Sequence, residues 1–211
     1  MYQIGDKVVH PMYGAGVVDS IVQKTVDGVV RDYYILKLPN RSMVVMVPTE
    51  NCDEIGVRPV VDQERADQVL AAIPDIQVEM TANWNHRYRE NMERMKSGDL
   101  IEVARVIKGL TLRDQSRGLS TGERKMLHSA KQILISEIVL SKSVSYEMVE
   151  EELNTALAYI VRKNQGGFFV PNRNEKAVIF CILEGEAESI GAMYHCPASA
   201  AGQRGPGGVY L

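Results

Sequence analysis

The sequence lacks the apolar run of roughly 18 residues that a membrane-spanning helix needs. Cysteine is scarce as well: Cys52, Cys181 and Cys196 are far apart and form no CxxC pair. The first residues, MYQIGD, do not have the basic stretch and apolar core of a secretory signal. We therefore expect a cytoplasmic protein without membrane contact, disulfide framework, metal or cofactor.

Motifs of the common enzyme classes are also absent. No GxGxxG, GxxxxGK[ST] or GxSxG occurs, which removes the support for dinucleotide, P-loop and serine-hydrolase chemistry. Cys52 and His10 remain as a thiol–imidazole pair, but a cysteine beside a strand end is more often buried filling. We expect a protein that is not an enzyme and has no small-molecule substrate.

The charge that is present is distributed unevenly. The formal net charge is −3, yet residues 84–131 contain eleven Lys and Arg against six Asp and Glu, whereas residues 1–83 contain seven against twelve. A polyanion meets one face of a protein and not its average charge. The segment 84–131 is thus a candidate for nucleic-acid contact.

Short strands are predicted for the first fifty residues. Apolar and β-branched runs at about 7–10, 15–22, 30–38 and 43–47 are separated by turn-forming residues, and Asp27-Gly28 is typical of a tight hairpin turn. Four or five short strands indicate a small closed barrel, because closure removes exposed edges.

Helical periodicity replaces this pattern in the rest of the chain. Helices are expected at about 62–72, 84–95, 100–110, 120–138 and 145–158. Ser120 and Glu123 form a capping-box pattern at the start of the fourth helix. Residues 74–82 have no strong periodicity and are expected to be a linker. Residues 159–211 carry no core-forming pattern and are expected to be poorly ordered.

The only tryptophan, Trp84, lies where this linker meets a helix, close to Arg87 and Arg89. Composition alone leaves two interpretations open. Trp84 is either a core aromatic or an exposed wedge that enters DNA at a base step while flanking cations hold phosphates.

A second basic group, Arg124, Lys125 and Lys131, lies on the capped helix. A solvated helix face explains such residues in most proteins. The excess of cations over acids across this region favours phosphate contact instead.

Two long segments resemble a specific family. Residues 83–110 (NWNHRYRENMERMKSGDLIEVARVIKGL) and 112–137 (LRDQSRGLSTGERKMLHSAKQILISE) are similar to the C-terminal domain of the CarD family of bacterial RNA polymerase-binding regulators, also called CdnL. The stretches GDKVVHPMYGAGVV, VVMVP and ENCDEIGVRPVV resemble the Tudor-like polymerase-interacting domain of that family. This domain also resembles a module of the transcription–repair coupling factor.

The resemblance implies an α+β chain of two modules. A small Tudor/SH3-like β-barrel is expected at residues 1–58 and a compact all-α bundle at 59–158, followed by the tail. The barrel would bind the RNA polymerase β subunit, partly by adding its edge strand to one there. Lys24, Val26 and Met46 fall at the barrel positions that would face polymerase. Met46 replaces a basic residue of well-known members, which weakens the case for an ionic contact there.

For the helical module, the resemblance implies contact with promoter DNA at the upstream edge of the transcription bubble. Trp84 would wedge into the opened minor groove and slow collapse of the bubble. Basic residues would grip the DNA backbone, and these are Arg87, Arg89, Arg124, Lys125 and Lys131. The protein would be a monomer associated with the nucleoid through RNA polymerase.

Two other hypotheses remain beside this one. An adaptor would use the helical module to bind another protein and would show no salt-dependent binding to DNA. An enzyme that uses Cys52 would lose its function when the thiols are alkylated.

Overall fold

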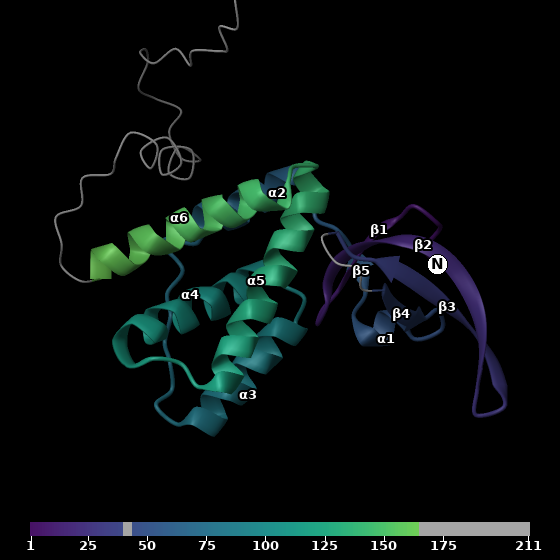
Figure 1. The fold of residues 1–211 in the computed structure, drawn as a ribbon, viewed down its shortest axis with the longest axis horizontal. Coiled ribbons are helices and arrows are strands. Elements are labelled where there is room, and N and C mark those ends of the chain that lie inside the picture. The colour runs from purple at the N-terminus through teal and green to yellow at the C-terminus, as the bar shows by residue number, and fades with distance from the viewer. Residues whose placement is uncertain (40–43, 165–211) are drawn as a thin grey trace, which may run out of the picture.

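The computed structural model describes residues 1–39 and 44–164, which form one antiparallel sheet and a bundle of helices (Figure 1). The sheet has the strand order β4-β3-β2-β1-β5. Its strands are β1 (Lys7–His10), β2 (Gly14–Val26), β3 (Val29–Lys37), β4 (Val44–Pro48) and β5 (Arg58–Pro59). The α+β class expected from the sequence is confirmed. Within the described ranges β4 and β5 do not pair with each other, so the sheet is open between them and is not a fully closed barrel.

The β2–β3 hairpin projects away from the helices (Figure 1). Its turn is Asp27-Gly28, where both residues have a positive φ, 52° and 78°. This is the requirement of a type I′ turn, whose twist matches that of the flanking strands. The predicted hairpin turn is confirmed, and β2 continues to Val26, four residues past the strand that the sequence pattern predicts.

One face of the sheet carries a small core of its own. Alternate residues of the strands are buried there with the short helix α1 (Cys52–Ile55), which connects β4 to β5. The buried members of this cluster are Val8, Val18, Tyr34, Leu36, Leu38, Val45, Val47, Cys52 and Val57.

Five longer helices form the second layer. They are α2 (Gln63–Ala72), α3 (Trp84–Lys96), α4 (Leu100–Arg117), α5 (Thr121–Lys142) and α6 (Tyr146–Asn164). The side chains of Asn83 and Asp99 cap α3 and α4, and the predicted capping box of Ser120 and Glu123 is present at α5. Such caps satisfy N–H groups that a helix start leaves unpaired.

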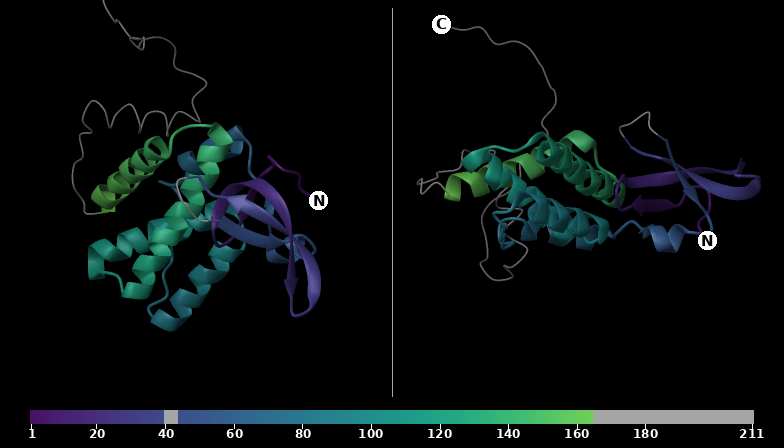
Figure 2. Two further views of the ribbon diagram at one scale, coloured as in Figure 1. Left: turned by 45° about the vertical axis from the view of Figure 1, so that its right-hand side comes forward. Right: turned by 90° about the horizontal axis from the view of Figure 1, so that it is seen from below.

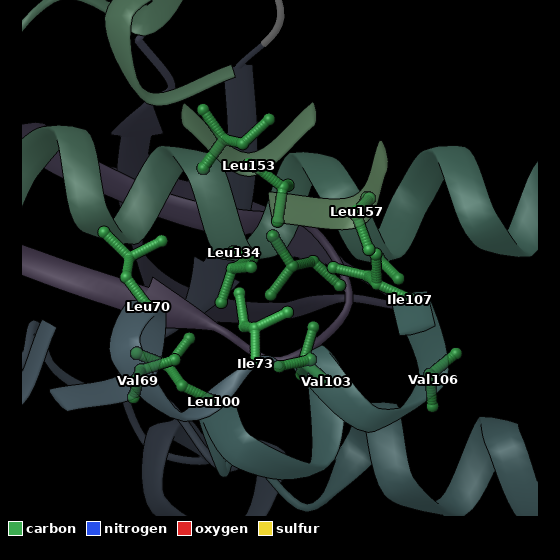
Figure 3. Close-up of a cluster of buried hydrophobic side chains, with 14 of the residues drawn as sticks. Val69, Leu70, Ile73, Leu100, Val103, Val106, Ile107, Leu134, Leu153 and Leu157 are labelled. Atoms are coloured by element: carbon green, nitrogen blue, oxygen red, sulfur yellow. The ribbon is translucent and has the colours of Figure 1, made fainter. Parts of the chain in front are cut away.

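Apolar side chains from α2, α4, α5 and α6 point toward one another in a single core (Figure 3). The final helix extends past residue 158, and Ile160 is buried in this core, so the structured part of the chain is longer than expected. Residues 165–211, including most of the predicted tail, lie outside the described residues.

The segment 74–82, expected to be a linker within the helical module, carries no helix or strand of its own. It joins α2 to α3 inside the helical layer and runs along α4. Lys108 donates a hydrogen bond to the Pro74 carbonyl, and a Cβ on Gly109 would meet Val78 at 2.8 Å. These contacts hold a segment that has no regular secondary structure against α4.

The sheet lies at one end of the helical bundle, against α5 (Figure 2). Gly14 has a φ of 92°, and a Cβ there would collide with the Ser136 hydroxyl. That hydroxyl accepts a hydrogen bond of 2.9 Å from the Ala15 N–H. Glycine is therefore required where β2 approaches α5.

A buried ion pair closes the same interface. Arg58 of β5 lies 2.9 Å from Glu137 of α5 through Nη2 and Oε2, and its guanidinium also donates to the Gly98 carbonyl. Glu137 accepts a further hydrogen bond of 3.2 Å from the Val61 N–H and is fully buried. Helix α5 and the connection between α3 and α4 thus both hold the sheet against the bundle.

None of the helices in the described ranges is long and apolar enough to cross a membrane.

Candidate nucleic-acid interface

Trp84 lies at the first position of α3, and its side chain is partly exposed. The residue is 45% exposed, whereas the apolar side chains of the core are almost all below a tenth. One ring face stacks on Tyr88, with centroids 5.4 Å apart and planes 25° from parallel. The indole N–H donates a 3.1 Å hydrogen bond to the Ser120 hydroxyl. Trp84 is therefore a surface residue held in one orientation and not a core aromatic.

The first turn of α5 supports the indole from the side. Ser120 is the N-cap of this helix, and a Cβ on Gly122 would lie 3.8 Å from Trp84 and 3.7 Å from Tyr88. These are ordinary contact distances, so the two rings rest on the start of α5. The pair Trp84–Tyr88 forms the ring pair discussed below.

Arg87 does not belong to the exposed surface. It is only 1% exposed, and its Nη2 lies 2.7 Å from Glu123 Oε1. Nη1 donates to the carbonyls of Thr81 and Ala82. The expected contact of Arg87 with the DNA backbone is at odds with this position, because the guanidinium is already bonded inside the bundle. Arg87 instead joins the 74–82 segment, α3 and α5.

Three of the expected DNA-contacting cations are exposed on the helices that carry or support the ring pair. Arg89 lies on the solvent side of α3, and Arg124 and Lys125 are exposed near the start of α5. Arg124 and Lys125 follow Ser120 by four and five residues, which is about 6–8 Å along a helix. Both cations thus lie within about a turn and a half of the residue that accepts the indole hydrogen bond.

Lys131 is on another face. Its Nζ donates a 2.9 Å hydrogen bond to Asn154 of α6, and burial lowers the pKa of its ammonium. It lines a hollow between α4, α5 and α6 with Thr111 and Gln115. The structure does not bring Lys131 together with Trp84.

Lys24, Val26 and Met46 of the sheet are all exposed, as a contact surface requires. The Lys24 ammonium lies 3.3 Å from the Met46 sulfur, so the two side chains touch across the outer face. β4 is an edge strand of the sheet. Two further exposed apolar residues, Val29 and Val44, lie on the same face by strand alternation and register. We call the set of Lys24, Val26, Val29, Val44 and Met46 the hairpin surface.

The comparison with known proteins matches both halves of the chain. Residues 2–61 match the family described as CarD-like/TRCF RID domain, and residues 68–154 match CarD, C-terminal domain. The Bacillus subtilis (strain 168) protein named "Putative transcription factor YdeB" is 30% identical over 150 residues, which cover 71% of this chain and 98% of that protein. The chain belongs to the CarD family. The resemblance seen in the sequence is confirmed.

Membership in the CarD family makes the chain a transcription regulator. The RID domain is an RNA polymerase-interacting domain, so the match over residues 2–61 supports RNA polymerase as a partner. The CarD family is one of transcription factors and not an enzyme family.

Cys52 and His10 fit this view. Burial raises the pKa of the Cys52 thiol. The thiol donates a hydrogen bond of 3.3 Å to the Pro48 carbonyl. Burial also lowers the pKa of His10. A reactive cysteine needs a depressed pKa, so Cys52 has the character of a core residue. The described residues contain no group of three or more His, Cys, Asp and Glu that could hold a metal ion.

Sequence reasoning does not identify the residues that support Trp84. The helical period assigns Tyr88 only to an apolar helix face, and the local motif gives Ser120 and Glu123 only the role of a cap. The capping box is the available signal for the last two, because it fixes where a helix begins and what its first turn can touch.

Proposed function

We propose that this protein stabilises the open promoter complex of RNA polymerase. The sheet binds the polymerase β subunit through the hairpin surface, with β4 adding to a strand of the partner. The helical layer then lies on promoter DNA at the upstream edge of the bubble. Trp84 wedges into the opened minor groove, and Arg89, Arg124 and Lys125 contact the backbone.

The exposure of Trp84 is the observation that carries this proposal. Trp84 remains 45% exposed to water, and its contacts with Tyr88 and Ser120 hold it at the surface. Proteins that open or bend DNA insert such apolar side chains at base steps from the minor groove. Exposed cations on α3 and α5 are available for phosphate contacts.

The edge position of β4 supports the polymerase contact. Backbone groups on the free side of an edge strand are available to another strand, and exposed side chains of alternate residues add specificity. Val44 and Met46 are such alternate residues on β4, 53% and 37% exposed. The apolar Met46 fits a contact made by burial of surface and not by an ion pair.

The energetics require only a small preference for melted DNA. A factor that binds the open form shifts the equilibrium by its differential affinity for the two forms. An inserted or stacked aromatic ring contributes about 1–3 kcal/mol, or roughly five- to hundredfold in population. Tethering to polymerase raises the local concentration, so the affinity of the helical layer for free DNA can stay weak.

The test is the lifetime of open complexes after challenge with a competitor. Trp84→Ala should shorten the lifetime about five- to hundredfold. Binding to polymerase should be unchanged, because Trp84 belongs to the helical layer and not to the sheet. Met148→Ala is the matched control, since it removes another exposed apolar side chain from the same layer. A Trp84→Ala protein that folds, binds polymerase and keeps the full lifetime would contradict the proposal.

Binding to DNA alone distinguishes the proposed function from the adaptor hypothesis. If the proposed function holds, the full chain should bind a forked, partly melted duplex, and the affinity should fall as salt rises, because phosphate contacts release counterions. An adaptor would show no such binding.

A further inference from the structure

We infer that Ser120 and the buried Glu123 are positioning residues for Trp84, which fix the indole in the orientation needed for insertion. This inference rests on the proposed function for its purpose, but its geometry is independent of DNA. A chain of hydrogen bonds runs from the exposed indole to a buried ion pair. It links Trp84 to Ser120, Ser120 to Glu123, and Glu123 to Arg87.

The direction of every bond in this chain is determined. The indole N–H is only a donor, and an ionised carboxylate is only an acceptor. Ser120 Oγ therefore accepts from Trp84 at 3.1 Å and must donate its single proton to Glu123 Oε2 at 2.8 Å. With its proton donated to Glu123, the hydroxyl oxygen accepts from two donors, the indole N–H and the Glu123 backbone N–H at 3.3 Å, and these three bonds fix its orientation.

Glu123 is itself held firmly. Burial alone raises the pKa of its carboxyl, but hydrogen bonds from the Ser120 backbone and from Arg87 outweigh burial, and the net pKa is below its ordinary value. Arg87 Nε donates to Oε1 at 2.9 Å, and Arg113 Nε lies 3.4 Å from the same oxygen. The carboxylate is thus charged and bonded at both oxygens, which makes it a rigid end for the chain.

Stacking on Tyr88 cannot do this alone. A ring face on a ring face limits tilting but permits sliding and rotation within the plane. The hydrogen bond at the indole edge removes that freedom. The two contacts together determine which edge of Trp84 faces the solvent and hence the DNA.

The proposal predicts a clear difference between two substitutions at one position. Ser120→Ala removes the acceptor of the indole bond, whereas Ser120→Thr keeps a hydroxyl and a helix cap. Net hydrogen-bond strengths imply that Ser120→Ala raises the population of other indole orientations about two- to tenfold. Ser120→Thr should behave like the wild type.

Fluorescence of the full chain measures this directly, because Trp84 is its only tryptophan. Time-resolved anisotropy without DNA should show a larger fast component for Ser120→Ala than for the wild type. Asp99→Ala is the matched control. Asp99 is the N-cap of α4, and its side chain accepts a hydrogen bond from the Ile101 N–H. It lies beyond the end of α3 that is opposite Trp84. The substitution should lower the melting temperature similarly and leave the anisotropy decay unchanged.

Three outcomes bear on the inference. An enlarged fast component in Ser120→Ala, restored by threonine and absent in Asp99→Ala, supports it. An unchanged indole in Ser120→Ala overturns it. An equal change in Asp99→Ala also overturns it, because loosening of the bundle would then explain the effect.

The functional arm separates this inference from the proposed function. Open-complex lifetime should fall about two- to tenfold in Ser120→Ala and recover in Ser120→Thr. If Trp84→Ala does not change the lifetime, the proposed function fails while the anisotropy result still decides whether Ser120 holds the indole. If Trp84→Ala shortens the lifetime but Ser120→Ala loosens the indole without shortening it, the positioning role is wrong and the wedge stands.

Discussion

Arg58→Ala should lower the free energy of unfolding by about 3 kcal/mol, because it leaves the Glu137 carboxylate buried without its cation. Removing one partner of a buried ion pair typically costs about 3–5 kcal/mol. The lower end applies because the Arg58 side chain is 29% exposed, so water can partly replace it. With typical domain stabilities of roughly 5–15 kcal/mol, this is a substantial fraction.

The double variant Arg58→Met, Glu137→Leu tests the same reasoning from the other side. An apolar pair of similar size often replaces a buried ion pair without loss. Here the Val61 N–H would lose its acceptor, so we expect a residual cost of about 1–2 kcal/mol. The double variant should therefore be more stable than the single one.

The free energy of unfolding is measured by urea titration. Circular dichroism and the fluorescence of Trp84 both monitor the transition. Coincident transitions justify a two-state free energy for each variant. A loss below about 1 kcal/mol in Arg58→Ala, or a double variant less stable than the single one, would refute the account of a buried, mutually dependent pair.

The remaining predictions concern the two proposed contact surfaces. Met46→Glu puts a charge into the hairpin surface and should weaken capture of RNA polymerase in a pull-down, whereas Met148→Glu on α6 should not; equal capture by both variants would remove Met46 from the contact. Arg124→Gln with Lys125→Gln should reduce the salt dependence of binding to a forked duplex, by about one unit of slope for each phosphate that the variant no longer neutralises. Lys131→Gln should leave that slope unchanged, and an equal reduction there would show that DNA reaches the face beside α6.

Local signals in the sequence are enough to predict parts of the fold. The Asp27-Gly28 turn and the capping box of Ser120 and Glu123 lie where the sequence predicts them, because each depends on the chemistry of a few adjacent residues. Residues 74–82 carry no helix or strand of their own, in keeping with their lack of helical periodicity. The order of that segment comes from packing on α4, which local sequence does not encode.

The same distinction explains the site residues. The sequence places Trp84 at the start of a helix. Its exposure, however, depends on the position of α5, because the indole bonds to Ser120, thirty-six residues later in the chain. Local sequence does not distinguish Arg87 from Arg89, because both lie in the same basic stretch. The two residues point to different sides of α3, and the buried partner of Arg87 is Glu123 on another helix.

Helix α5 joins the two proposed contact surfaces through the residues at its ends. Ser120 and Glu123 hold the indole at its start, and Glu137 holds β5 near its end. Seventeen residues separate Ser120 from Glu137, which corresponds to about 25 Å of straight helix. In the proposed complex this helix would set the distance between the polymerase contact and the DNA wedge, because a helix changes its length far less easily than a loop does. Weakening either end should thus shorten open-complex lifetime even where Trp84 and the hairpin surface are intact.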